Sequence, residues 1–116
     1  MLLQRMPVLQ VLLTHKVLAE VIGTFTMIFV GAGSILLTER FPQTFPPFII
    51  PLAWGLTIAL MIFAVGHISG AHFNPAVTLA FIAAKRVPVS AIYIYWPSQF
   101  IGGLLAICLL GVLKRL

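Results

Sequence analysis

The sequence predicts an all-α membrane protein with three membrane-spanning helices and one helix of about half that length. Three observations predict it. The 116 residues are 61% hydrophobic and 8% charged, with a mean hydropathy of +1.15, whereas soluble domains carry about 25% charged residues. Three apolar runs reach the roughly 20 residues that a membrane helix needs. A fourth, residues 75–84, is too short to cross. We expect a single membrane domain over residues 1–116.

The N-terminal segment, residues 1–14, contains apolar stretches that Pro7 and Gln10 interrupt. No small-residue cleavage site follows it, so a removed signal peptide is not expected. Because proline is tolerated in the first turn of a helix, we expect a short separate helix that lies at the membrane surface.

The three predicted spans cover residues 17–37, 48–66 and 89–113. At roughly 1.5 Å per residue, the first gives about 31 Å of helix, which is enough to cross the hydrocarbon core. Pro97 lies inside the last span, where proline predicts a kink or a local repair of the helix.

Small residues recur at a spacing of four, which lets membrane helices approach each other closely. The pairs are Ala19 with Gly23, Gly55 with Ala59, and Gly102 with Ala106. Together they favour a tightly packed bundle.

Residues 67–84 form the least regular part of the chain. Asn74 can cap a helix with its side-chain oxygen, and Pro75 suits the first helical position. The polar residues before them must then be non-helical at membrane depth, which is tolerated only where protein buries them or where they line a wet cavity. We expect a re-entrant loop that returns as a half-helix, with Lys85 and Arg86 at the surface.

Such a half-helix directs its N-terminus, with roughly half a positive charge, at the middle of the bilayer. The free carbonyl groups of the preceding residues would form a ladder of hydrogen-bond acceptors leading to it. Neutral hydrogen-bonding molecules could exchange along this ladder, whereas a cation would be repelled. The alternative is a dry, buried kink between two packed helices.

The stretch GHISGAHFNPAVT, residues 66–78, closely resembles the signature of the aquaporin, or major intrinsic protein, family. AEVIGTF at 19–25 is similar to the first helix of that family, and YWPSQFIGG at 95–103 is similar to its third. The resemblance covers residues 17–113 in the order of the family's first half. It implies an aquaporin-like half-repeat of three transmembrane helices plus one re-entrant half-helix.

The resemblance also implies roles for the residues of this stretch. The Asn74 amide would donate hydrogen bonds to the permeant at mid-pore, within the motif Asn74-Pro75-Ala76. Trp54, which precedes Asn74 by 20 residues, stands where the family places the second-helix residue of its outer constriction. Tryptophan there resembles glycerol-conducting and nodulin-like members. The carbonyl groups expected to line the approach are those of Gly70, Ala71, His72 and Phe73.

Three further residues have expected roles. Glu20 and Gln99 would support the re-entrant loop from inside the bundle, and His67 either faces the pore or packs in the core. The single cysteine, Cys108, fits a packing role. The sequence has no clustered carboxylates and no metal-ligand spacing, so we expect no enzyme, metal or cofactor. No basic-aromatic patch suggests nucleic acid as a partner.

Complete members of the family contain two inverted halves, and this sequence matches one. Val77 follows Ala76, so no residue matches the arginine that follows the second Asn-Pro-Ala motif of the family. With the N-terminus inside, four basic residues lie inside and three outside, a weak orientation bias. The four inside are Arg5, Lys16, Lys85 and Arg86, and the three outside are Arg40, Lys114 and Arg115. We therefore hypothesise that two antiparallel copies rebuild the inverted repeat. The rivals are a separate second half and a piece of a longer channel.

The leading function is half of a passive channel for water or small neutral solutes such as glycerol, in the cell membrane. Its partners would be the lipid bilayer and either a second half or further copies of the chain, as an antiparallel dimer or a higher oligomer. One alternative is a dual-topology, proton-coupled small transporter that uses Glu20. Another is a non-conducting channel fragment that only packs against other membrane proteins.

Overall fold

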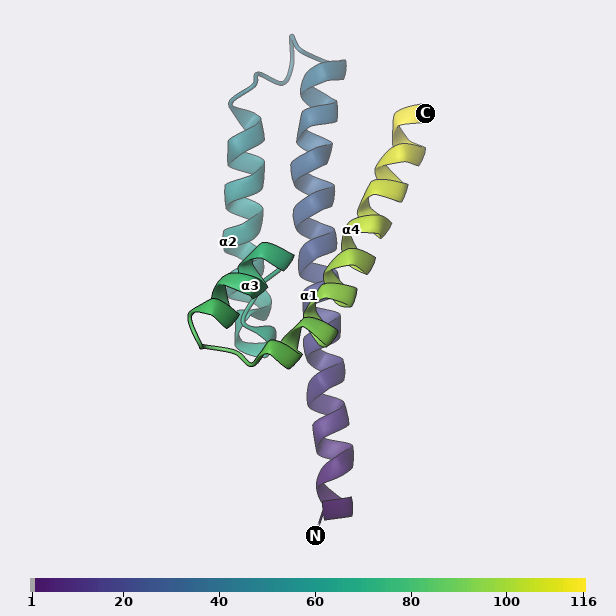
Figure 1. Cartoon of the computed structure of the whole chain (residues 1–116). Helices are drawn as coiled ribbons and strands as arrows, with labels where there is room; N and C mark the ends of the chain where they lie inside the picture. The colour runs from purple at the N-terminus through teal and green to yellow at the C-terminus, as the bar shows by residue number, and fades with distance from the viewer. Residues whose placement is uncertain (1) are drawn as a thin grey trace.

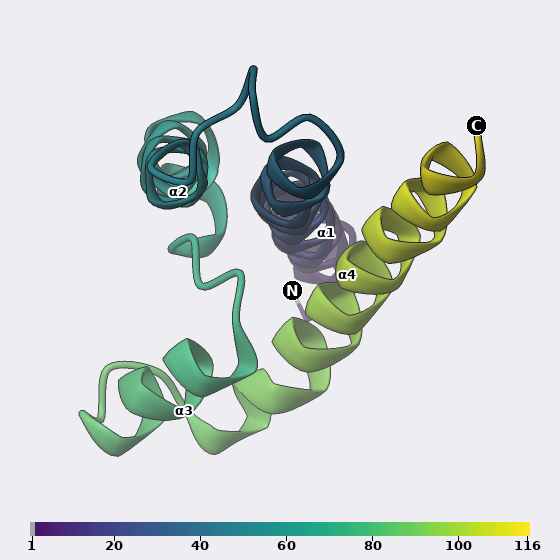
Figure 2. The same cartoon turned by 90° about the horizontal axis from the view of Figure 1, so that it is seen from above.

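The computed structural model describes residues 2–116, with side chains from residue 7 onward. Within that range the regular elements are all helices, as predicted. The elements are α1 (Leu2–Arg40), α2 (Ile49–Ser69), α3 (Pro75–Ala83), a single 3-10 turn η1 (Val89–Ala91) and α4 (Ile92–Arg115). The long helix α1 lies between α2 and α4 (Figure 1). Seen from above, α3 lies off this row, beside the beginning of α4, against which it packs (Figure 2).

Three helical segments of the described chain are long and apolar enough to cross a membrane. They are Pro7–Arg40, Ile49–Ser69 and Val89–Arg115. The protein is therefore an integral membrane protein whose three spans agree with the three that the sequence predicted.

The separate surface helix expected over residues 1–14 is absent, because α1 runs unbroken from Leu2 to Arg40. Pro7 lies so near the start that it removes only one early helical bond, and the chain has no glycine or proline between Val8 and Lys16 to end the helix. At roughly 1.5 Å per residue, α1 is about 58 Å long, nearly twice the hydrocarbon thickness. Its N-terminal end accordingly projects beyond the other helices (Figure 1).

The second span is longer than predicted, because α2 continues to Ser69 and includes His67. It ends where Gly70 takes a left-handed backbone conformation, with φ of 89°, which glycine adopts at little cost. The re-entrant loop expected to start at residue 67 therefore starts at Gly70.

The half-length helix is present as predicted from its sequence signals. The Asn74 side chain accepts the backbone N–H of Ala76 at 2.8 Å, and Pro75 is the first residue of α3. The nine residues of α3 rise about 14 Å, less than half of the hydrocarbon core.

The last span differs from the prediction only in detail. It begins with the 3-10 turn η1, and α4 then continues to Arg115 without a break at Pro97. Pro97 falls in the second turn of α4, where it deprives only the carbonyl of Tyr93 of its helical donor.

Two of the three small-residue pairs are buried, one against the ring of Phe73 in the loop and the other in a helix contact. Ala19 and Gly23 of α1 and Gly102 and Ala106 of α4 are buried. A Cβ on Gly102 would overlap the carbonyl oxygen of Val21, so glycine is what permits this close approach of α4 to α1. The third pair, Gly55 with Ala59, is exposed on α2, because it lies on a face of α2 that no other part of the described chain covers.

Candidate functional site

The connection between α2 and α3 is held in an unusual backbone conformation. Gly70, Ala71 and Phe73 all have positive φ, of 89°, 51° and 54°. For a residue other than glycine this conformation costs about 1–3 kcal/mol, and it persists only where the surroundings fix it. The loop therefore needs support from side chains elsewhere in the fold.

That support is the carboxylate of Glu20, which is completely buried on α1. One oxygen, Oε1, accepts the Ser69 hydroxyl at 2.7 Å and the His72 backbone N–H at 2.9 Å. The other, Oε2, accepts the Phe73 backbone N–H at 2.7 Å and the Gln99 amide at 3.0 Å. Four hydrogen bonds thus occupy the acceptor sites of an ionised carboxylate.

Thr78 of α3 extends this network to α4. Its hydroxyl accepts the second bond of the Gln99 amide at 3.1 Å and lies 3.0 Å from Nδ1 of His72. Thr78 is completely buried. Because Gln99 bonds both Glu20 and Thr78, one amide group ties α1, α3 and α4 together.

The His72 side chain belongs to the core. Its ring lies between those of Phe81 and Tyr95, with centroids 4.6 Å and 4.3 Å away. The Tyr95 hydroxyl in turn donates to the carbonyl of Ser69 at the end of α2. The ring of His72 is thus held in place by this stacking and by its contact with the Thr78 hydroxyl.

Phe73 is also held from both sides. Its ring packs so closely on Gly23 that a Cβ there would overlap it, and its carbonyl accepts the Thr24 hydroxyl at 3.2 Å. Among the described residues, no hydrogen bond uses the carbonyl oxygens of Gly70, Ala71 or His72. Of the four carbonyl groups in the expected ladder, three are thus free and the fourth is engaged.

Asn74 is exposed, and the direction of its side chain follows from its cap. Because Oδ1 accepts the N–H of Ala76, the amide nitrogen faces away from α3, and within the described chain it makes no hydrogen bond. A pocket of about 260 Å³ adjoins Phe73, Asn74 and Pro75, between α1 and α4. Ala76, the third residue of the motif, is exposed.

Trp54 lies on the same side of α1 as the loop. Its ring covers Gly31, where a Cβ would overlap it. Gly31 follows Glu20 by 11 residues, about three helical turns, so it shares the face of Glu20 about 16 Å further along α1. His67 is exposed in the last turn of α2, and it is not packed against the described part of this chain.

Sequence reasoning missed several members of the site. They are Thr24, Ser69, Thr78 and Tyr95. A signal for three of them exists, because residues four apart share a helix face. Thr24 follows Glu20 by four residues, Thr78 follows Asn74 by four, and Tyr95 precedes Gln99 by four.

The polar groups of the site differ in whether they are already hydrogen-bonded within the fold. The only buried carboxylate of the described chain is fully hydrogen-bonded, and no group of three potential metal ligands occurs among the described residues. The unbonded groups of the loop, within the described chain, are three successive carbonyl oxygens and, after them, the Asn74 amide at the N-terminus of α3. This set can both donate to and accept from a small neutral molecule.

The family model and the curated relatives that follow all point to the same family. The sequence model of the family described as Major intrinsic protein matches residues 8–115. Aquaporin NIP3-1 of Arabidopsis thaliana is 41% identical over 95% of this chain and 34% of its own length. Aquaporin Z of Photorhabdus laumondii is 46% identical over 85% of this chain and 43% of its own length. Nodulin-26 of Glycine max is 42% identical over 79% of this chain and 34% of its own length. The chain thus spans less than half the length of these relatives.

Proposed function

This chain belongs to the major intrinsic protein family, and from that premise we propose that it forms half of a passive channel for water and small neutral solutes. The observation that carries the proposal is the free amide of Asn74, aimed away from α3 by its own cap. As a channel component the chain needs no cofactor or catalytic residue, and we propose the cell membrane as its location.

The proposed pathway passes the loop before it reaches the half-helix. A permeant would donate hydrogen bonds to the carbonyls of Gly70, Ala71 and His72, and would then accept them from Asn74. The N-terminus of α3 carries roughly half a positive charge, which opposes a cation at the same point. A neutral molecule that can both donate and accept meets no such barrier.

We propose Trp54 as a constriction residue further along the pathway. The support is its position on the same face of α1 as the loop, where its ring covers Gly31. An indole presents one N–H donor and a large apolar surface. This combination suits a solute such as glycerol, which has hydroxyl groups along one edge and C–H groups along the other. His67, exposed near the loop, could line the mouth of the same pathway.

A second half would have to complete the pore. The helix α3 rises about 14 Å, whereas the hydrocarbon core is about 30 Å thick. One side of α3 is also uncovered: Ala76, Val77, Leu79 and Ala80 are exposed. We propose that an antiparallel second copy covers them, because the basic residues give only a weak orientation bias. A separately encoded second half and a further length of the same polypeptide are the alternatives.

Topology labelling tests the antiparallel copy. Single cysteines at residue 2 and residue 116, in a Cys108→Ala background, would be labelled from each side of intact membranes. Both positions should react partly from both sides if the chain inserts in two orientations. Labelling of each position from one side alone would exclude the antiparallel copy and leave the two alternatives. It would not bear on conduction.

Conduction is tested by osmotic shrinkage of proteoliposomes that contain only this chain. Asn74→Asp keeps the capping oxygen but removes the amide donors, so the half-helix should persist while flux falls. Asn74→Ala removes both the cap and the donors, and it reports on folding. Fast shrinkage that Asn74→Asp abolishes, with unchanged helical content, supports the proposal. Shrinkage no faster than in empty liposomes means that this chain alone does not conduct.

The proton-coupled transporter is disfavoured by the surroundings of Glu20. A proton carrier must exchange protons with water, whereas this carboxylate is completely buried and bound by four donors. Solute flux that requires a pH gradient across the liposome would reverse this preference.

A further inference from the structure

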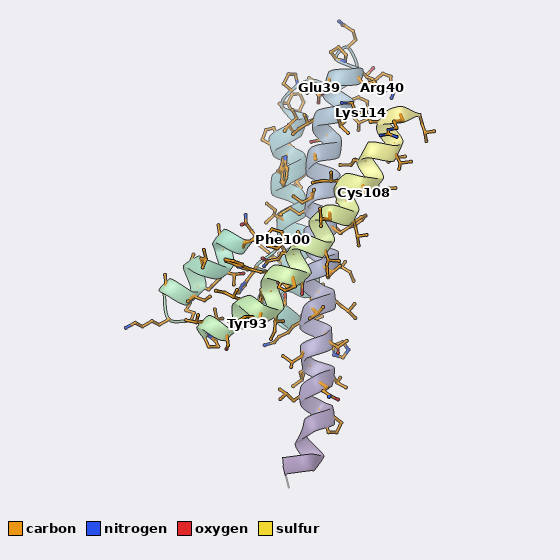
Figure 3. All side chains as sticks on the ribbon, turned by 45° about the vertical axis from the view of Figure 1, so that its right-hand side comes forward. Glu39, Arg40, Tyr93, Phe100, Cys108 and Lys114 are labelled. Carbon is orange, nitrogen blue, oxygen red and sulfur yellow. The ribbon has the colours of Figure 1, made fainter. Side chains whose placement is uncertain are left out.

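A larger pocket, of about 760 Å³, lies at the opposite end of the molecule from the loop. It is bounded by the C-terminal parts of α1 and α4 and by the beginning of α2. Its walls are apolar, and they include Phe29, Val30, Leu37, Ile49, Leu110 and Leu113. Glu39, Arg40 and Lys114 lie at its end, and they gather at the same end of the bundle in Figure 3. Its volume falls within the range of about 300–1,000 Å³ that is typical of small-ligand sites.

This pocket is not part of the proposed pathway. Phe29 and Gly33 line it, and each follows a residue of the loop-facing side of α1, Glu20 and Thr24, by nine residues. Nine residues are about two and a half helical turns, so they lie on opposite faces of the helix. Val30, Leu37 and Leu113 of its lining are exposed, so the pocket is open to the outside of the described chain.

The charged end of the pocket is predominantly basic. Arg40, Lys114 and the adjacent Arg115 are all exposed, and Glu39 is the only acid in the lining. Basic residues are favourable at the C-terminal ends of helices, where the helix dipole is negative. One N–H of Arg40 donates to the carbonyl of Lys114 near the end of α4, at 3.4 Å. A guanidinium group has five N–H donors, so most of its capacity to bind an anion is unused.

We propose that this pocket binds an anionic phospholipid, with an acyl chain along the apolar walls and the phosphate at Arg40 and Lys114. The positive end and the apolar trough complement the two parts of such a lipid, and both lie where α1, α2 and α4 meet at one end of the spans. Arginine and lysine side chains can hold a phosphate by charge-assisted hydrogen bonds. The site is independent of whether the chain conducts.

Native mass spectrometry of the full chain in detergent tests the site. Dioleoylphosphatidylglycerol and dioleoylphosphatidylcholine would be titrated separately, with glycerol 3-phosphate as a headgroup that lacks acyl chains. We expect the anionic lipid to be retained in preference to the zwitterionic one. Because each basic side chain contributes roughly fivefold in affinity near an acidic headgroup, the double change Arg40→Gln and Lys114→Gln should weaken retention about 20- to 30-fold.

Two further variants keep the test specific. Lys85→Gln with Arg86→Gln removes equal charge outside the pocket, and retention should stay unchanged. Gly33→Ala adds a methyl group to the apolar wall, where its Cβ would meet only Leu110 at 3.5 Å, so it should weaken lipid retention without unfolding the chain. Equal retention of both lipids, equal losses in both double variants, or binding of glycerol 3-phosphate as tight as that of the lipid would each overturn the proposal.

Discussion

Glu20 in the first span accepts the backbone N–H of Phe73, 53 positions later in the sequence, at 2.7 Å. The same carboxylate accepts the N–H of His72, so one side chain fixes two successive peptide groups of the re-entrant loop. An ionised acceptor strengthens these bonds relative to neutral ones. The unusual backbone of the loop is thus maintained by a residue of another helix.

Replacing Glu20 by glutamine should destabilise the loop. The amide would place an N–H₂ group against donors that now bond the carboxylate, leaving buried donors unpaired. Because each unpaired group costs about 1–3 kcal/mol, we expect a loss of about 2–4 kcal/mol in the free energy of unfolding, measured by circular dichroism in detergent. Glu39→Gln, which changes the exposed acid, is the matched control and should unfold like the parent chain. Similar stability of the two variants would contradict the role given to Glu20.

A methyl group on Gly102 should separate α4 from α1. Its Cβ would overlap the Val21 carbonyl oxygen, which is backbone and cannot rotate away. Overpacking of this kind costs about 1–3 kcal/mol, measurable as a lower thermal midpoint of Gly102→Ala. The neighbouring Gly103 has nothing within 4 Å of such a Cβ. Gly103→Ala should therefore be neutral, or more stable by up to about 1 kcal/mol because alanine favours the helix. If both variants lose stability equally, helix contact is not the reason for Gly102.

The Thr78 hydroxyl should contribute measurably to the free energy of unfolding. Thr78→Val preserves the shape of the side chain but leaves the Gln99 amide and the His72 ring without their shared partner. We expect a loss of about 1–3 kcal/mol, together with faster proteolysis within residues 70–74. Thr26→Val removes a hydroxyl that bonds only its own helix, at the carbonyl of Ile22, and it should be nearly neutral. A neutral Thr78→Val would mean that the network does not hold the loop.

Removing the Trp54 ring should change selectivity, if the ring narrows the proposed pathway. Trp54→Ala is expected to raise solute flux relative to water flux in liposomes that conduct, since the indole now covers Gly31. Glycerol re-swelling after osmotic shrinkage measures this ratio. Phe63→Ala, on an 89% exposed residue of the same helix, should leave the ratio unchanged. An unchanged ratio in Trp54→Ala would remove Trp54 from the pathway.

Several features of the fold were predictable because they depend on local chemistry. The three spans follow from the length of the apolar runs. The start of α3 follows from an asparagine that caps and a proline that fits the first turn. Local rules were less reliable at the N-terminus, where Pro7 suggested a separate helix. Since no further breaker follows before Lys16, α1 instead continues without interruption.

The site was predictable only in part. Glu20 could be singled out because an acid inside a membrane span is costly, and Asn74 because of its cap. The partners of Glu20 are 49 to 79 positions away in the sequence, and no periodicity links them. The spacing of four that marks Thr24, Thr78 and Tyr95 shows a shared helix face, but it does not show what that face meets.

The sequence by itself therefore determined that this is a membrane protein of three spans and a half-helix, because hydrophobic length and capping act within a few turns of the chain. Only the tertiary structure decided that His72 and Phe73 turn their rings into the core while Gly70 and Ala71 leave their carbonyls free. The tertiary structure also decided that the carboxylate of Glu20 holds the loop in this conformation, by accepting the backbone N–H groups of His72 and Phe73. Those outcomes depend on which helices pack together, and packing is set by contacts between residues that the linear sequence keeps far apart.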